Sequence, residues 1–213
     1  PDDWVRRQLS VVGLRVLTEL RGTPAIAADL EPASKKNICT SRSFGKLIET
    51  REGLAEAIAN FAASCAAKLR AQGSCAKSVN TFINTNPFRT ADRQHAGSIT
   101  LEMDVATSDS AEIVRYALKG LDIIYRDGFK FMKAGVIVAY IVPEEVVQGS
   151  FFDEVDRQRS RRLMQTVDSV NRSLGRDVVR LAVQGFEKRY RLRQEHMSQR
   201  YTTNIHEVLH VKI

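Results

Sequence analysis

The sequence predicts an α+β fold with the element order β-α-β-β-α-β, a four-stranded antiparallel sheet that carries both helices on one face. Four stretches alternate apolar and polar side chains, as strands do. Two other stretches, which lie between these, repeat apolar residues every three or four positions, as buried helices do. The opposite face of such a sheet stays open, and a small module follows the domain.

The first predicted strand covers residues 37–45. Alternation sends its larger side chains to one face and its small polar side chains to the other. The small polar set is Asn37, Cys39, Ser41 and Ser43. The other strands are expected at 78–85, 98–105 and 131–140. In the third strand, Ser98 and Thr100 lie on the polar side, opposite a continuous apolar side.

The two helices of the domain are predicted at 51–72 and 108–126. Cys65 lies in the apolar stripe of the first, so we interpret it as a small core residue. Asp109 or Ser110 is placed to cap the second.

Flanking segments complete the chain. Residues 3–20 are expected to form one amphipathic helix, and 23–34, with two prolines, a tether. Residues 144–160 are polar and predict a linker, and 163–171 predict a short helix. The remainder is expected to be a small strand-containing module.

Charge is unevenly distributed in this chain of 213 residues with a net charge of +7. Residues 157–213 hold 13 Lys and Arg against 5 Asp and Glu. A basic tail favours an acidic partner such as nucleic acid, with a solvated Arg-rich surface as the alternative. The three cysteines form no C-x-x-C pair, which is typical of a reduced cytoplasmic protein without a disulfide framework or zinc. No apolar run approaches the roughly 20 residues of a membrane span.

Enzyme-like patterns are weak. His206 to His210 matches the H-E-x-x-H of zinc proteases, but the chain stops three residues later and the segment alternates like a strand. Glu102 and Asp104 share one strand face, yet the neighbouring strands supply no further carboxylate for a two-metal site. No glycine-rich phosphate loop is present. We therefore expect no catalytic residue, no metal ligand and no cofactor in this sequence.

Four short motifs carry a family resemblance: Ser41–Gly45, Thr85–Phe88, Lys133–Val136 and Arg200–Thr203. With them the chain, from about Val11 to Lys212, resembles the C-terminal part of UmuC-type Y-family translesion DNA polymerases. The resemblance implies the end of a thumb and a tether at 1–34, a little-finger DNA-binding domain at 35–142, a linker at 143–160 and a small UmuC-type domain at 161–213. It also implies that the catalytic palm, with its Mg²⁺, lies elsewhere, so this fragment should be inactive by itself.

The same resemblance implies that the open sheet face lies in the DNA major groove and contacts mainly the backbone. The DNA-facing set is then Lys36, Ser41, Arg42, Ser43, Ser98, Thr100 and Lys133. Strand parity puts Arg42 with Phe44, so Arg42 would reach DNA only from a strand end. Glu102 and Asp104 would repel phosphate if they lay beneath it.

Residues 148–152 resemble the peptide with which bacterial polymerases dock on the sliding clamp. A flexible segment can place two rings in an apolar pocket while a Gln satisfies polar groups at its rim. The implied clamp-binding residues are Gln148, Ser150, Phe151 and Phe152. In the alternative, the two rings pack on the domain itself. UmuD-type and RecA-type mutagenesis proteins are further implied partners.

Two functional hypotheses follow. The first is a DNA-binding and clamp-docking fragment of an error-prone polymerase in DNA damage tolerance and SOS mutagenesis. The second is a free-standing ferredoxin-like module, unrelated to polymerases, for nucleic acid or a ligand. An RNA-recognition domain of this topology would carry several aromatic residues on its central strands, and only Phe82 is available. Residues 189–193 alternate basic and apolar side chains, so a strand there would present three arginines to phosphate or an acidic protein.

Overall fold

The computed structural model describes residues 1–26, 34–153, 155–188, 190–192 and 194–208. The chain divides into two compact units, Pro1–Ser34 and Lys35–Ile213. The first unit contains α1 (Asp2–Leu20), whose backbone leaves the helical region at Ser10 with φ 61° and ψ −170°. The expected single helix is therefore two helical segments joined at Ser10, and no residue of α1 is buried.

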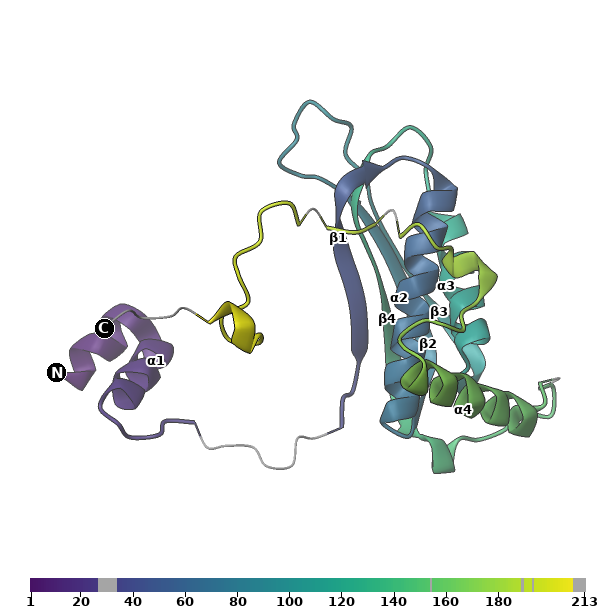
Figure 1. Ribbon diagram of the computed structural model, residues 1–213, viewed down its shortest axis with the longest axis horizontal. Coiled ribbons are helices and arrows are strands. Elements are labelled where there is room, and N and C mark those ends of the chain that lie inside the picture. Colours follow the sequence, from purple (N-terminus) through teal and green to yellow (C-terminus); the bar gives the residue numbers. More distant parts are fainter. Residues whose placement is uncertain (27–33, 154, 189, 193, 209–213) are drawn as a thin grey trace. The chain divides into compact units, whose positions relative to one another are not determined.

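The second unit begins with the predicted β-α-β-β-α-β order. Its elements are β1 (Ile38–Ile48), α2 (Arg51–Ala71), β2 (Ser74–Thr85), β3 (Ala96–Thr107), α3 (Ser110–Ile124) and β4 (Phe131–Pro143). The strands form one sheet in the order β1-β4-β2-β3, and every neighbouring pair is antiparallel. Both α2 and α3 cover the same face of this sheet (Figure 1). The predicted fold class is confirmed.

Side-chain caps fix where the two helices begin. The Thr50 hydroxyl accepts a hydrogen bond from the Gly53 amide at 3.3 Å at the start of α2. The Asp109 carboxylate accepts from the amides of Ala111 and Glu112 at 2.6 and 3.1 Å at the start of α3. Each cap satisfies amides that have no partner within the helix, which favours starting the helix at that residue.

The core lies between the two helices and the sheet. Its largest fully buried side chains include Leu54, Ile58 and Leu69 of α2, Ile113 and Leu121 of α3, and Val79, Ile83, Phe131, Val136 and Val138 of the strands. Cys65 is fully buried among them, as predicted, and its burial raises the pKa of the thiol. The thiol therefore stays protonated and serves as a packing group.

The helix after the domain starts earlier than expected. Following β4 come η1 (Glu144–Val146), α4 (Arg157–Ser173), η2 (Ala182–Gln184) and η3 (Ile205–Glu207). α4 thus begins inside the predicted linker and extends beyond the predicted 163–171. The Asp156 carboxylate caps it by accepting from the Arg159 amide at 3.0 Å.

The predicted strand content of the C-terminal module is wrong for the residues described. None of those after 160 belongs to a strand. Tyr190 to Leu192 are irregular, and the flanking Arg189 and Arg193 of the predicted arginine strand lie outside the described residues. Within the described part of the chain, no helix is long and apolar enough to cross a membrane.

The C-terminal module packs on the outer face of α2. The Asn60 amide donates to the Gln184 carbonyl at 2.6 Å, and the Gln184 side-chain amide donates back to Asn60 at 3.3 Å. The Tyr190 ring meets Phe61 edge to face, with centroids 5.2 Å apart. The Gly45 amide of β1 donates to the Arg191 carbonyl at 3.1 Å. Gln184 and Tyr190 therefore cover α2 on the side opposite the sheet.

Candidate nucleic-acid interface and docking loop

The open face of the sheet is organised in rows that cross all four strands. Ser41, Gly135, Phe82 and Ser98 are successive partners across β1, β4, β2 and β3. Paired residues project from the same face of a sheet, so the side chains of Ser41, Phe82 and Ser98 lie in one row, with Gly135 between the first two. The adjacent rows are Ser43, Lys133, Asn84 and Ala96 on one side, and Cys39, Ile137, Asn80 and Thr100 on the other.

Phe82 lies across Gly135 at the centre of this face. A Cβ built on Gly135 would be 2.4 Å from the Phe82 Cζ atom and 2.4 Å from the Ser41 Cβ atom. Real Cβ atoms do not approach other atoms so closely, so only glycine leaves room for both neighbours. The missing side chain lets the ring lie low and keeps the open face nearly flat. A flat face of small side chains allows the backbone of a nucleic acid to approach the sheet closely.

Hydroxyl and amide groups fill the half of the face formed by β2 and β3. The Asn80 side-chain amide donates to the hydroxyls of Thr100 at 2.9 Å and Ser98 at 3.1 Å. Ser98 and Thr100 are both exposed, so their oxygens remain available to a second partner. Asn80 therefore orients both hydroxyls. The Ser98 hydroxyl also donates to the Asn80 side-chain oxygen at 3.4 Å, and the Thr100 hydroxyl can donate to a phosphate oxygen.

Five of the seven residues predicted to face DNA come together on this open face. They are Ser41, Ser43, Ser98, Thr100 and Lys133. Lys36 is exposed two residues ahead of β1. Arg42 pairs with Ala134, a fully buried residue, so it projects toward the side of the sheet that α2 covers. Arg42 is therefore not part of the open face.

Sequence reasoning missed the centre of the face. In the sequence, Phe82 serves only as an argument against RNA recognition, for which several aromatic residues on the central strands are expected. Asn80, Asn84 and Gly135 are absent from the predicted DNA-facing set. The polar alternation of 78–85 was a signal for the two asparagines. The approach of Phe82 to Gly135 depends on strand order and register, which alternation within one strand does not provide.

The carboxylates considered for chemistry do not converge. Glu102 and Asp104 are exposed at the far end of β3 from Ser98. Within the described part of the chain, no cluster of three His, Cys, Asp or Glu side chains has metal-binding geometry. In the H-E-x-x-H segment, Glu207 accepts from Arg200 and Asn204, at 2.9 Å from Nη2 and 2.7 Å from Nδ2. His210 lies outside the described residues.

The predicted clamp-binding peptide forms an exposed loop. Phe151 and Phe152, the largest apolar side chains of the segment, are fully exposed. Gln148 is also exposed, and Ser150 is half-buried. A turn follows, in which the Asp153 amide donates to the Ser150 carbonyl at 3.2 Å. The two rings therefore do not pack on the domain, contrary to the alternative interpretation.

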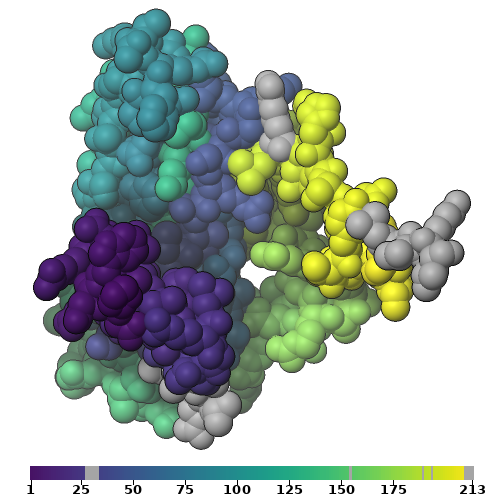
Figure 2. Space-filling model, turned by 90° about the vertical axis from the view of Figure 1, so that its left-hand side faces the viewer, coloured from purple at the N-terminus to yellow at the C-terminus, as the bar shows by residue number. Residues whose placement is uncertain are grey.

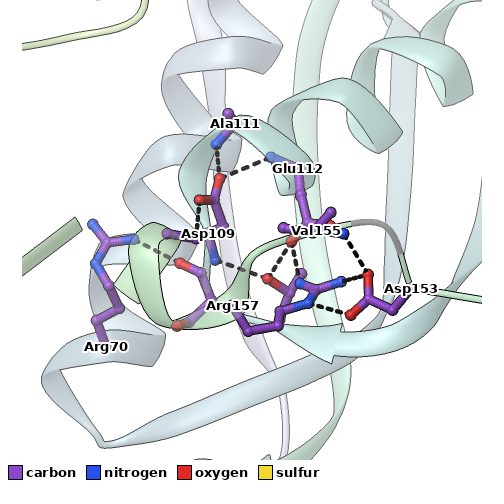
Figure 3. A network of polar contacts seen from close by, with 10 residues as sticks. Arg70, Asp109, Ala111, Glu112, Asp153, Val155 and Arg157 are labelled. Atoms are coloured by element: carbon purple, nitrogen blue, oxygen red, sulfur yellow. Dashed lines mark hydrogen bonds and ion pairs between the residues drawn. The ribbon is translucent and has the colours of Figure 1, made fainter. Parts of the chain in front are cut away.

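The loop is tied down on both sides. Before it, the Glu144 amide donates to the Gly73 carbonyl at 3.0 Å, and the Glu144 carboxylate pairs with Arg161 of α4. After it, the Arg157 guanidinium bridges Asp153, at 2.6 and 2.9 Å, and Glu112 of α3, at 2.6 Å (Figure 3). These contacts replace the expected free linker by a short closed loop.

Protonation of Asp153 should loosen the start of α4. The hydrogen bond from Arg157 holds the pKa of the Asp153 carboxyl below its ordinary value of 3.8. The pKa is thus lower in the folded chain, so the stabilisation is complete above pH 3.8 and is lost as the pH falls through the folded value. We expect the protection of the amides at the start of α4, measured as their exchange rate relative to an unfolded chain at the same pH, to fall over that acid range. In Asp153→Asn this protection should be reduced already at neutral pH, and identical protection in the two proteins at every pH would contradict the contact.

Comparison with known proteins identifies the family. The model of the impB/mucB/samB family C-terminal domain matches residues 35–151. A second model, described as Domain of unknown function (DUF4113), matches residues 161–211. Neither match includes α1.

Relatives of known name match nearly the whole chain. Protein UmuC of Salmonella typhimurium strain LT2 is 33% identical over 211 residues, which are 98% of this chain and 50% of that protein. Protein ImpB of Salmonella typhimurium is 33% identical over 201 residues, 94% of this chain and 47% of that protein. Protein MucB of Escherichia coli is 33% identical over 200 residues, again 94% and 47%.

The chain therefore spans about half the length of these relatives. The alternative of a module unrelated to the UmuC-type proteins is rejected, and the resemblance drawn from the sequence is confirmed. The chain belongs to the impB/mucB/samB family and carries the C-terminal domain of its members.

Proposed function

We propose that this chain is the DNA-binding and sliding-clamp-docking part of an error-prone translesion DNA polymerase that acts in DNA damage tolerance and SOS mutagenesis. Family membership supports the polymerase context, since the relatives are UmuC, ImpB and MucB proteins. Polymerisation and its Mg²⁺ belong, in this proposal, to a palm domain that the described residues do not include. UmuD-type and RecA-type proteins are proposed partners on family grounds.

The observation that carries the DNA-binding role is the open face itself. Short hydroxyl and amide side chains surround Phe82, and Lys133 adds a positive charge next to Ser43. Such groups suit phosphate and sugar. Among the described residues of this face there is no arginine, the side chain that most often reads a base edge, and the Asn80 amide is already bonded to two hydroxyls of β3. Contact with the backbone alone lets a protein move along any sequence, including damaged template.

Charge reversal at two lysines tests this role. In a Lys36→Glu/Lys133→Glu protein, affinity for primer–template DNA should fall by at least about tenfold at low salt, because two phosphate contacts become repulsive. Arg115 and Lys119, exposed on α3, offer a control with the same charge change. Fluorescence anisotropy at several salt concentrations gives the affinities. Equal losses in the two proteins would show a general charge effect and would remove the open face as the contact surface.

The observation that carries the docking role is the closed loop with two fully exposed rings. Exposed phenylalanines are costly in water, so their joint display favours a partner with an apolar pocket. The anchors at Glu144 and Arg157 hold the loop ends in place, which lowers the ordering entropy that binding must offset. A bacterial sliding clamp is the partner we propose for this loop.

A further inference from the structure

A cavity of about 1520 Å³ lies on the side of the domain opposite the open face. It is lined by α2, by α4 and by residues of 176–188, 190 and 191. Small side chains of α2, among them Ser64, Ala67 and Ala71, form its floor. Because these side chains are short, α4 and the following segment stand over α2 without filling the space between. In Figure 2 a gap is visible between the blue surface around β1 and α2 and the green surface of the later residues.

Specific polar contacts fix the elements that line this cavity at their positions over α2. The Arg70 guanidinium of α2 donates two hydrogen bonds to the Asp168 carboxylate of α4, at 2.6 and 2.7 Å. Arg70 also donates to the Ser108 carbonyl at 2.7 Å. The buried Asn60 and Gln184 pair joins the second wall to α2. The space is therefore framed by well-satisfied polar groups, so we regard it as a built feature of the fold.

The lining of the cavity is strongly positive. It includes ten Lys and Arg side chains and six Asp and Glu side chains. Four of the carboxylates are paired with cations, and Asp109 caps α3 and accepts from Ser160. Among the described residues, several lining cations form no ion pair. These are Arg42, Lys68, Arg172, Arg176, Arg180 and Arg191.

We infer that this cavity binds a single-stranded, phosphate-bearing segment of nucleic acid. Unpaired cations in a groove attract a polyanion, and a positively charged groove is what proteins use to follow the backbone of a single strand. Beside the cavity and outside its lining, the Phe186 ring is 81% exposed, and its centre lies 4.7 Å from the guanidinium carbon of the lining residue Arg180. A base of a strand that leaves the cavity can stack there. The residues of the second family match, 161–211, thereby gain a role.

The position of the cavity relative to β1 supports this occupant. The Lys68 ammonium donates to the Thr40 hydroxyl of β1 at 3.0 Å, and Arg42 is on the same side of that strand. Ser41 and Ser43 of the same strand face the opposite way, onto the open face. β1 is an edge strand, so a single strand that leaves duplex DNA on the open face reaches the cavity by passing one strand edge. In this respect the inference rests on the proposed DNA-binding function.

The test compares single-stranded and duplex DNA on the same proteins. In Arg172→Glu/Arg176→Glu, affinity for a fluorescent oligo-dT should fall at least about tenfold, and the salt dependence of log Kd should lose about 1.4 units of slope. Affinity for blunt duplex DNA should change less than about twofold, since the open face is untouched. Arg115→Glu/Lys119→Glu makes the same charge change on α3 and should leave both affinities near the parent values.

A second variant tests the space of the cavity without changing its charge. Ala67→Phe fills the floor and keeps every cation, so it should also weaken oligo-dT binding, with duplex binding unchanged. Melting curves verify that each protein is folded. Parent-like oligo-dT binding by Ala67→Phe, or by the double arginine variant, would overturn the inference. The Lys36→Glu/Lys133→Glu protein tests the open face through duplex binding, whereas the cavity variants test the cavity through oligo-dT binding. A wrong open-face proposal is therefore distinguishable from a wrong cavity proposal.

Discussion

Replacing Phe151 and Phe152 by alanine is expected to abolish binding to a bacterial sliding clamp and to leave the melting temperature unchanged. Both rings are fully exposed in the free chain, so their removal costs the fold almost nothing. Each ring buried in a pocket contributes roughly 1.5 to 3 kcal/mol. The intact loop should then bind with about micromolar affinity, and the double variant should bind at least about a hundredfold more weakly.

Calorimetric titration with a sliding clamp measures the affinity, and melting curves of the same proteins measure their stability. Phe88→Ala is the matched control, because that ring is 90% exposed in a different loop and should have no effect on clamp binding. Unchanged affinity in the Phe151 and Phe152 variant would remove the docking role. A large fall in its melting temperature would show that the rings pack on the fold in solution.

Gly135→Ala is expected to destabilise the domain by about 1 to 3 kcal/mol, the usual cost of overpacking. The new methyl group would lie 2.4 Å from atoms of both Phe82 and Ser41, and strands β1 and β2 flank β4 closely on either side. The ring must move away from the sheet, so duplex DNA binding should weaken together with stability.

Denaturant unfolding and duplex binding, measured in parallel, test this expectation. Gly149→Ala is the control, since a Cβ there meets no atom within 4 Å. Adding Phe82→Ala to Gly135→Ala should restore part of the lost stability, because one of the two close contacts disappears. Parent-like stability in the single variant would show that the open face has more room than the structure indicates.

The sheet and its two helices were predictable because each follows from a short-range pattern. Alternation placed Ser41, Ser43, Ser98 and Thr100 on one face, and parity already separated Arg42 from them. Strand order was beyond such patterns. Only the pairing of β2 with β4 brings Phe82 beside Gly135, and that pairing joins residues about fifty positions apart.

The segment after β4 was misjudged for a different reason. Residues 144–160 have few apolar side chains, and hydrophobic periodicity is the signal from which helices are predicted. The start of α4 is fixed instead by Asp156 as a cap and by the charges of Asp153, Arg157 and Glu112. Since Glu112 lies 45 residues before Arg157, no local pattern contains this contact.

The contact of Tyr190 with Phe61 means that two sequence families share one folding unit. Tyr190 lies in the second matched region, yet it is 7% exposed and belongs to the same buried cluster as Leu54 and Ile58 of the first. A chain cut between the two regions would leave Phe61 bare on α2, an apolar surface that favours aggregation. The boundary between the two matched regions is therefore a poor place to divide the protein for expression.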